Sequence, residues 1–173
     1  YTGDFLFYGD KSKTVIKMEQ GGPINLFKFV NSTGITFDGL KIEDQRTLVS
    51  NIGLDFQNCN DVTVKNLDFE ISNGAGILVR EDISRNLPKS CNNINIERNF
   101  FKNCAGIDGE GAIVVSPKLK SKNMIIADNW IEGGINGTAA AIWAGCAMED
   151  AVIRDNYIDD IIGQRISSLA GIG

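Results

Sequence analysis

The 173-residue sequence contains no histidine, and this absence excludes a large part of enzyme chemistry. Without imidazole there is no histidine acid–base catalysis, no histidine metal ligand and no Ser-His triad. The four cysteines contain no CxxC pair, so no zinc site is expected; they are Cys59, Cys91, Cys104 and Cys146. We expect no cofactor, and any catalysis must therefore depend on other side chains.

Long runs of one chemical character are also missing. There is no cluster of Lys and Arg, the formal net charge is −5 and the pI is near 4.8, so nucleic-acid binding is not expected. No stretch approaches the roughly 18 consecutive apolar residues of a membrane span, so no membrane insertion is expected. No secretory signal is visible, but the chain begins at Tyr1 without an initiator methionine, so this says little about compartment.

Proline is scarce, with 3 residues, whereas glycine is common, with 19. This balance, together with abundant asparagine, is typical of tight turns with positive φ rather than of long helices. The length predicts one domain, residues 1–173, large enough to bury a core.

What the sequence does contain is a repeat, clearest in the segment NMIIADNWIEGG at 123–134. Its pattern recurs with unit origins spaced by 27, 32, 30 and 27 residues, at Ile35, Val62, Ile94, Met124 and Ala151. The positions two and seven residues after each origin are always apolar. A second apolar, alternating strand follows in every unit, at 26–30, 53–57, 76–80, 111–115 and 140–144. A repeat of this kind determines the architecture.

Two further positions of the repeat are informative. Five residues after the origin stand Asn99, Asn129 and Asn156, which predicts a row of amides hydrogen-bonded from coil to coil. The alternative is that each asparagine separately suits an αL turn. Cys59 and Cys91 both lie three residues before an origin, which favours a column of small buried side chains, with a disulfide between coils as the alternative.

These patterns predict an all-β fold, a right-handed parallel β-helix of about six coils. The strands are short and non-local, with no NG or DG hairpin turn between alternating runs, which argues against an antiparallel meander, and no helical period supports βαβ units. We expect an irregular opening coil at 1–22, regular coils over 23–173, and loop insertions at 81–90, 106–111, 118–121 and 134–138. Because the last residues coincide with another second strand, we expect a fragment of a longer solenoid, or one end covered by a partner.

The units GITFDGLKIED, NINIERNFFKNC and NMIIADNWIEGG resemble those of the pectate-lyase-like β-helix superfamily. The opening YTGDFLFYGDKSKTVIKM, followed by NLFKFVNSTGITFDGLKI, is similar to the first coils of bacteriophage tailspikes and related polysaccharide depolymerases. This resemblance implies a polysaccharide partner such as capsule or O-antigen, a homotrimer, and a location on a virion tail or outside the cell. The histidine signature of polygalacturonases and the pectate-lyase arginine motif are both missing.

The outward position six residues after the origin carries three successive aromatics, Phe100, Trp130 and Tyr157. Large aromatics in a row predict an interaction surface, and sugar rings stack well on them. The alternative is that a loop or a neighbouring subunit covers this column. Trp143, outward on the second strand of its unit, is a separate candidate for substrate binding.

Acidic residues accompany this column. Asp108 and Glu110 lie among three glycines in the loop 106–111, and stacking is expected to bring this loop beside Glu132. Glycoside hydrolysis needs two carboxyl groups roughly 5–9.5 Å apart, and crowded carboxylates raise one pKa. These three residues are therefore the catalytic candidates, although a plain acidic turn or a cation site is the alternative. Arg80 could form one wall of the groove, or simply pair with nearby charges.

Two functions remain open from the sequence. The first is a polysaccharide depolymerase, by glycosidic hydrolysis or by lyase chemistry. The second is a non-catalytic structural or adhesive β-helix of a tail fibre or surface adhesin. Acidic and aromatic residues share one face on this register, and this favours the enzyme.

Overall fold

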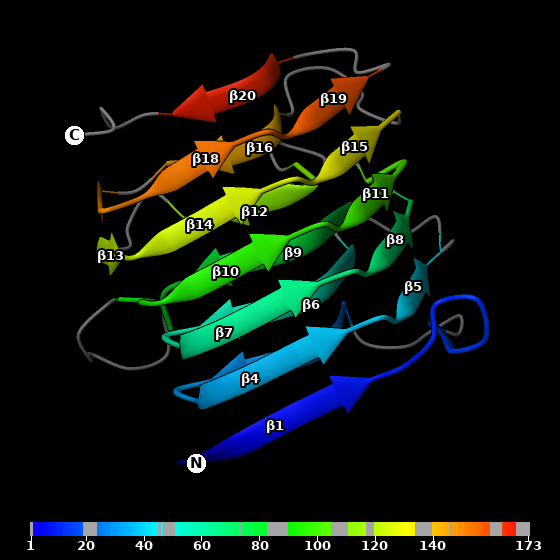
Figure 1. The fold of residues 1–173 in the computed structure, drawn as a ribbon, viewed down its shortest axis with the longest axis horizontal. Coiled ribbons are helices and arrows are strands. Elements are labelled where there is room, and N and C mark those ends of the chain that lie inside the picture. The colour runs from blue at the N-terminus through cyan, green and yellow to red at the C-terminus, as the bar shows by residue number, and fades with distance from the viewer. Residues whose placement is uncertain are drawn as a thin grey trace.

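The computed structural model shows a solenoid built entirely from strands and turns (Figure 1). The residues that it describes are 2–18, 24–44, 46, 51–72, 74–82, 90–104, 111–116, 120–133, 140–145, 147–159 and 164–168. Within them there is no helix, and every pairing between named strands is parallel. The predicted parallel β-helix is therefore confirmed.

The strands form three parallel sheets of six strands each. The first sheet contains β1 (Thr2–Tyr8), β4 (Thr33–Asp38), β7 (Asn60–Lys65), β10 (Ile94–Glu97), β14 (Met124–Ala127) and β18 (Val152–Arg154). The second contains β2 (Val15–Lys17), β5 (Lys41–Asp44), β8 (Asp68–Ile71), β11 (Phe100–Lys102), β15 (Trp130–Glu132) and β19 (Tyr157–Asp159). The third contains β3 (Asn25–Val30), β6 (Asn51–Gln57), β9 (Gly74–Arg80), β12 (Ile113–Val115), β16 (Ala140–Ala144) and β20 (Gln164–Ser168).

The number of coils differs slightly from the prediction. The regular repeat, from Ile35 to Ala151, makes about 4 turns, whereas about six coils were expected. Each sheet nevertheless contains six strands, because the opening strands and the closing strands also join the sheets. A small additional sheet pairs β13 (Lys120–Lys122) with β17 (Ala147–Glu149), and β13 occupies part of the insertion expected at 118–121.

The bend inside each repeat unit is sharper than the sequence pattern suggested. What looks like one kinked strand is two strands in two different sheets, as β14 and β15 show for the segment 123–134. In the opening coil, β1 pairs with β4 through a register shift between Thr2 and Phe5.

The register of the repeat is confirmed at each unit. The first residues of the units are paired in the order Ile35, Val62, Ile94 and Met124. Apolar side chains at like positions therefore stack inside the solenoid and form one continuous core. Phe69 and Phe101 illustrate this packing, because their rings are parallel within 3° with centroids 4.7 Å apart. Such in-register stacks bury each large side chain against its counterpart from the next coil.

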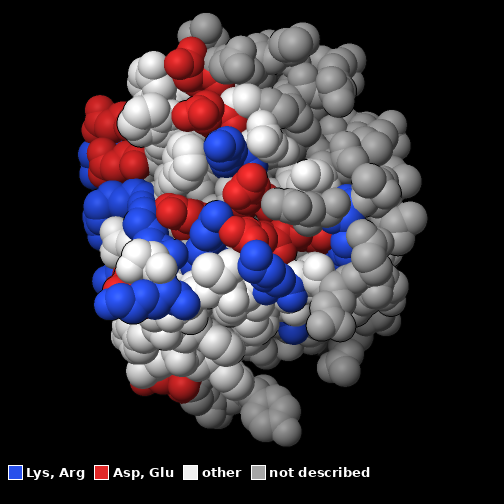
Figure 2. Space-filling model, turned by 90° about the vertical axis from the view of Figure 1, so that its right-hand side faces the viewer, with Lys and Arg blue, Asp and Glu red and all other residues white. Residues whose placement is uncertain are grey.

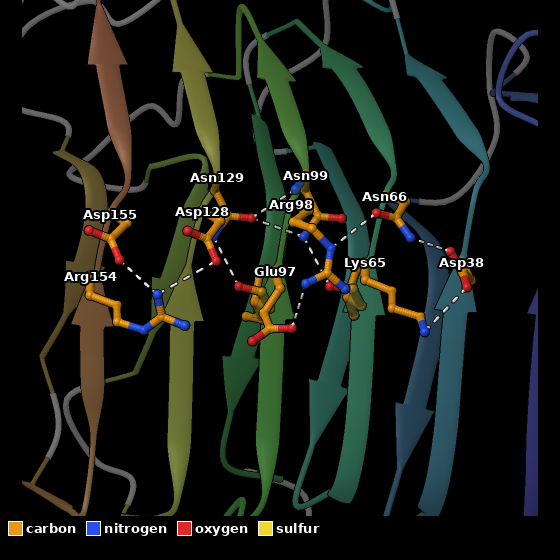
Figure 3. A network of polar contacts seen from close by, with 12 residues as sticks. Asp38, Lys65, Asn66, Glu97, Arg98, Asn99, Asp128, Asn129, Arg154 and Asp155 are labelled. Atoms are coloured by element: carbon orange, nitrogen blue, oxygen red, sulfur yellow. Dashed lines mark hydrogen bonds and ion pairs between the residues drawn. The ribbon is translucent and has the colours of Figure 1, made fainter.

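The predicted asparagine row is also confirmed, and it lies at the bend between the first two sheets (Figure 3). The Asn99 amide donates to Oδ1 of Asn129 at 3.0 Å, and the Asn129 amide donates to Oδ1 of Asn156 at 2.9 Å. Each amide also donates to a backbone carbonyl, for example from Asn129 to Ile96 at 2.9 Å. The buried polar groups of this bend are therefore satisfied within the row.

The alternative interpretation of these asparagines, an αL backbone, is wrong. The positive φ angles belong instead to the preceding position of the repeat, four residues after each origin. These residues are Gly39, Asn66, Arg98, Asp128 and Asp155, with φ between 53° and 73°. Glycine, asparagine and aspartate tolerate this conformation best, so Arg98 is an exception.

Cys59, Cys91 and Cys104 are all buried in the apolar core. The interpretation of Cys59 and Cys91 as a column of small buried side chains is therefore confirmed. Burial raises the pKa of Cys59 and raises that of Cys104 to about 12, which keeps the thiols protonated. Cys146 lies outside the described residues, as do most of the insertions at 81–90, 106–111 and 134–138.

The asparagine row can be tested with Asn129→Ala. This substitution leaves the Asn99 amide N–H and the Ile96 carbonyl without their buried partners. We expect the free energy of unfolding to fall by about 2–4 kcal/mol, because each unsatisfied buried polar group is costly. Urea denaturation followed by circular dichroism measures it.

Asn95→Ala on β10 is the matched control, because the buried Asn95 Oδ1 has no hydrogen-bond partner within the described structure. Its loss should change stability by less than about 1 kcal/mol. Equal losses for the two variants would show that the row contributes nothing specific.

Candidate functional site

A groove of about 440 Å³ lies along the outer surface of the second sheet and the bend that precedes it. Its lining residues come from three successive coils and from the turn between β1 and β2: Lys11, Asp68, Arg98, Asn99, Phe100, Asp128, Trp130 and Glu132. Three of the residues predicted from the sequence, Phe100, Trp130 and Glu132, are therefore brought together here. The groove exists because strand pairing places like positions of successive coils side by side.

The predicted aromatic column is present as a ladder of Phe100, Trp130 and Tyr157, paired in register from β11 through β15 to β19. The rings of Phe100 and Trp130 have centroids 6.1 Å apart, and those of Trp130 and Tyr157 are 5.0 Å apart, both edge-to-face. Trp130 is 50% exposed and Tyr157 is 54% exposed. The described residues therefore leave about half of the Trp130 and Tyr157 side chains exposed.

The N-terminal half of the same face carries ions instead of aromatics, and Figure 2 shows acidic and basic side chains interleaved over it. In the column of the aromatic ladder, Lys41 pairs with Glu43 and, at 3.4 Å, with Glu70. Hydrogen bonds from Lys17 and Lys41 lower the pKa of Glu43 below its usual value. Glu43 therefore stays ionised and is unsuited to donate a proton at neutral pH.

The groove contains three carboxylates in different settings. Asp68 forms an ion pair with Lys11 at 2.7 Å, and Asp128 forms a longer one with Arg154 at 3.7 Å. Glu132 makes no ion pair or side-chain hydrogen bond among the described residues, and it is half-buried beside the aromatic ladder. Of the three, Glu132 is thus the carboxylate most available to a ligand.

The other predicted site residues lie elsewhere or cannot be placed. Asp108 and Glu110 are outside the described residues. Arg80 and Trp143 belong to the third sheet, and neither lines the groove. Arg80 binds the fully buried Asp55 through Nε and Nη2, at 3.0 and 2.7 Å, so its charge pairing is structural. The half-buried Trp143 packs on a small apolar cluster with Ile52, Ala75, Leu78 and Val114.

Five groove residues were not predicted as site residues: Lys11, Asp68, Arg98, Asn99 and Asp128. Asp68 belongs to the column of the aromatic ladder, so the register could have identified it. Arg98 and Asp128 belong to the positive-φ column, where an arginine among Gly, Asn and Asp was a visible signal. Lys11 reaches Asp68 from 57 residues away, and no local pattern predicts that contact.

Among the described residues, no group of three or more Cys, Asp or Glu is placed to hold a metal ion. That part of the chain also holds no helix long and apolar enough to cross a membrane. Comparisons with protein-family models, with curated proteins and with solved structures each found no match. The class that the fold defines is therefore an all-parallel β-solenoid, and no homologue adds a finer assignment.

We expect the aromatic ladder to contribute little to the stability of the core. Two adjacent residues of β15, the exposed Trp130 and the buried Ile131, test this expectation. Trp130→Ala should lower the free energy of unfolding by less than about 1 kcal/mol, because half of the side chain is already in water. Ile131→Ala, at a position only 1% exposed, should lower it by about 2–5 kcal/mol. Chemical denaturation of the two variants gives the comparison, and a larger loss for Trp130→Ala would contradict the assignment.

Proposed function

We propose that this protein binds a cell-surface polysaccharide in the groove of the second sheet. The observation that carries this proposal is the half-exposed aromatic ladder bordering a groove lined with polar side chains. An exposed row of this kind is unfavourable for a surface in water, so it is typical of an interaction site. Sugars present apolar C–H faces and many hydroxyls, which suit aromatic rings and charged hydrogen-bonding groups respectively.

The dimensions of the ladder also favour a chain-like ligand. Its rings follow one another every coil, with centroids 5.0 to 6.1 Å apart. A single small molecule would use only part of such a row, whereas a polymer laid along the solenoid can contact each coil in turn. The groove itself spans at least three coils, because Asp68, Phe100 and Trp130 are consecutive members of one column.

A second candidate function, hydrolysis of the bound glycan, is favoured by Glu132. This carboxylate lies in the same groove as Phe100 and Trp130 and has no ionic partner among the described residues. Glycosidases use a pair of carboxyl groups, and Asp68 and Asp128 are the other described carboxylates of the groove. Asp108 and Glu110 remain candidates from the sequence.

The resemblance to phage tailspikes extends the proposal to assembly and location. We propose a homotrimer on a virion tail or outside the cell, with a capsule or O-antigen polysaccharide as its partner. The parallel β-helix supports this idea only at the level of the fold. A non-catalytic adhesin or tail-fibre shaft with the same fold is the alternative.

Binding can be measured on an array of purified capsular and O-antigen polysaccharides, followed by calorimetry on the tightest binder. We expect Trp130→Ala to weaken affinity by at least about tenfold, because a stacked aromatic supplies both apolar area and shape. Val152→Ala is the control, since Val152 is 42% exposed on the first sheet and does not line the groove. Equal affinity for wild type and Trp130→Ala would remove the ladder from the binding site.

Cleavage is tested by incubating the bound polysaccharide with wild type, Glu132→Gln, Asp108→Asn and Glu110→Gln. For a hydrolase that uses Glu132, release of new reducing ends should fall by at least about 10²-fold in Glu132→Gln while affinity is retained. Wild-type rates in all three variants would show that the catalytic candidates are wrong. Binding without any release by wild type would establish the adhesive alternative.

A further inference from the structure

Arg98 occupies a backbone position that is unusual for its residue type. It has φ of 54° at the bend between β10 and β11. The four other members of this column are residues that adopt positive φ readily: Gly39, Asn66, Asp128 and Asp155. Arginine has no short polar side chain to stabilise this conformation, so its presence here is destabilising. A residue kept in an unfavourable conformation is a candidate for a functional role.

The contacts of Arg98 within the protein do not account for its presence. Its side chain is 51% exposed, and its contacts are an ion pair from Nη1 to Glu97 at 3.2 Å and a long hydrogen bond from Nε to Asn66 at 3.4 Å (Figure 3). Exposed pairs of this kind contribute little to stability. Nη2 has no partner in the described part of the chain, which leaves donors of the guanidinium free.

Arg98 also lines the groove, next to the start of the aromatic ladder at Phe100. None of the three groove carboxylates forms an ion pair with it among the described residues. Two of them are paired with other cations, Asp68 with Lys11 and Asp128 with Arg154. The groove therefore contains a cation whose free donors are not used by its own acidic residues.

We infer that Arg98 is a specificity-determining residue that binds an anionic substituent of the glycan, such as a carboxylate, sulfate or phosphate group. This inference rests on the proposed function. A guanidinium binds planar or tetrahedral oxyanions through two parallel N–H donors, and it does so more strongly than it binds neutral hydroxyls. The aromatic ladder then holds the sugar faces, while Arg98 selects glycans that carry a negative charge at this point.

The experiment compares wild type with Arg98→Asn, which introduces the residue type that the column already holds at Asn66. On an array with carboxylated, sulfated, phosphorylated and neutral polysaccharides, wild type should prefer one anionic class. Arg98→Asn should weaken binding of that class by at least about tenfold and leave neutral glycans unchanged. Its melting temperature should rise by about 2–4 °C, because asparagine relieves the unfavourable backbone conformation.

Lys122→Asn is the matched control, since Lys122 is also exposed, at 59%, and also pairs with an acid, Glu149, but neither residue lines the groove. It should change neither affinity nor selectivity. Equal affinity of wild type and Arg98→Asn for anionic glycans, or an equal loss in Lys122→Asn, overturns the inference. In those cases binding that still depends on Trp130 leaves the proposed function standing. Binding of no glycan at all overturns both.

Discussion

The structure depends on the in-register pairing of parallel strands from one coil to the next. Each strand residue of a coil lies about 4.8 Å from its paired counterpart in the neighbouring coil, so each strand position of the repeat becomes a column. A column is stable only where its members tolerate one another. Apolar residues satisfy this condition in the core, amides satisfy it at the bend, and oppositely charged side chains satisfy it on the outer surface. The aromatic ladder follows the same rule, with rings that meet edge to face.

One outer column changes character along the solenoid, and this change creates the candidate site. Lys41 and Asp68 are held by ion pairs with neighbouring side chains, whereas Phe100, Trp130 and Tyr157 form the aromatic ladder. In the first coils this column therefore consists of charged side chains that pair with their neighbours. In the later coils it consists of exposed aromatic rings. Only the second kind has unused contact area for a ligand. Function and fold are separable here because outward positions can vary without disturbing the inward ones.

The sequence was sufficient to predict the fold, the register and the asparagine row, because each depends on residue types repeated at regular spacing. It predicted the composition of the aromatic ladder and its proximity to Glu132 for the same reason. It did not show that the bend separates two sheets, because a kink within a strand and a change of sheet have the same apolar pattern. Lys11 and Arg98 were missed since their places in the groove depend on turn geometry and long-range contact.

The asparagine row also has a direction. The side chains of Asn99 and Asn129 each donate to the asparagine of the following coil, and their Oδ1 atoms accept from the preceding coil, beginning where the Leu67 N–H donates to Asn99 Oδ1 at 3.0 Å. The side-chain dipoles are therefore aligned head to tail along the solenoid axis, and hydrogen bonds in such a chain polarise one another. Asn156, at the far end, keeps the equivalent bond to the carbonyl of Ile126 and donates also to the carbonyl of Arg154. The bend is thus an electrically polar spine inside an apolar core, with its positive end toward β19.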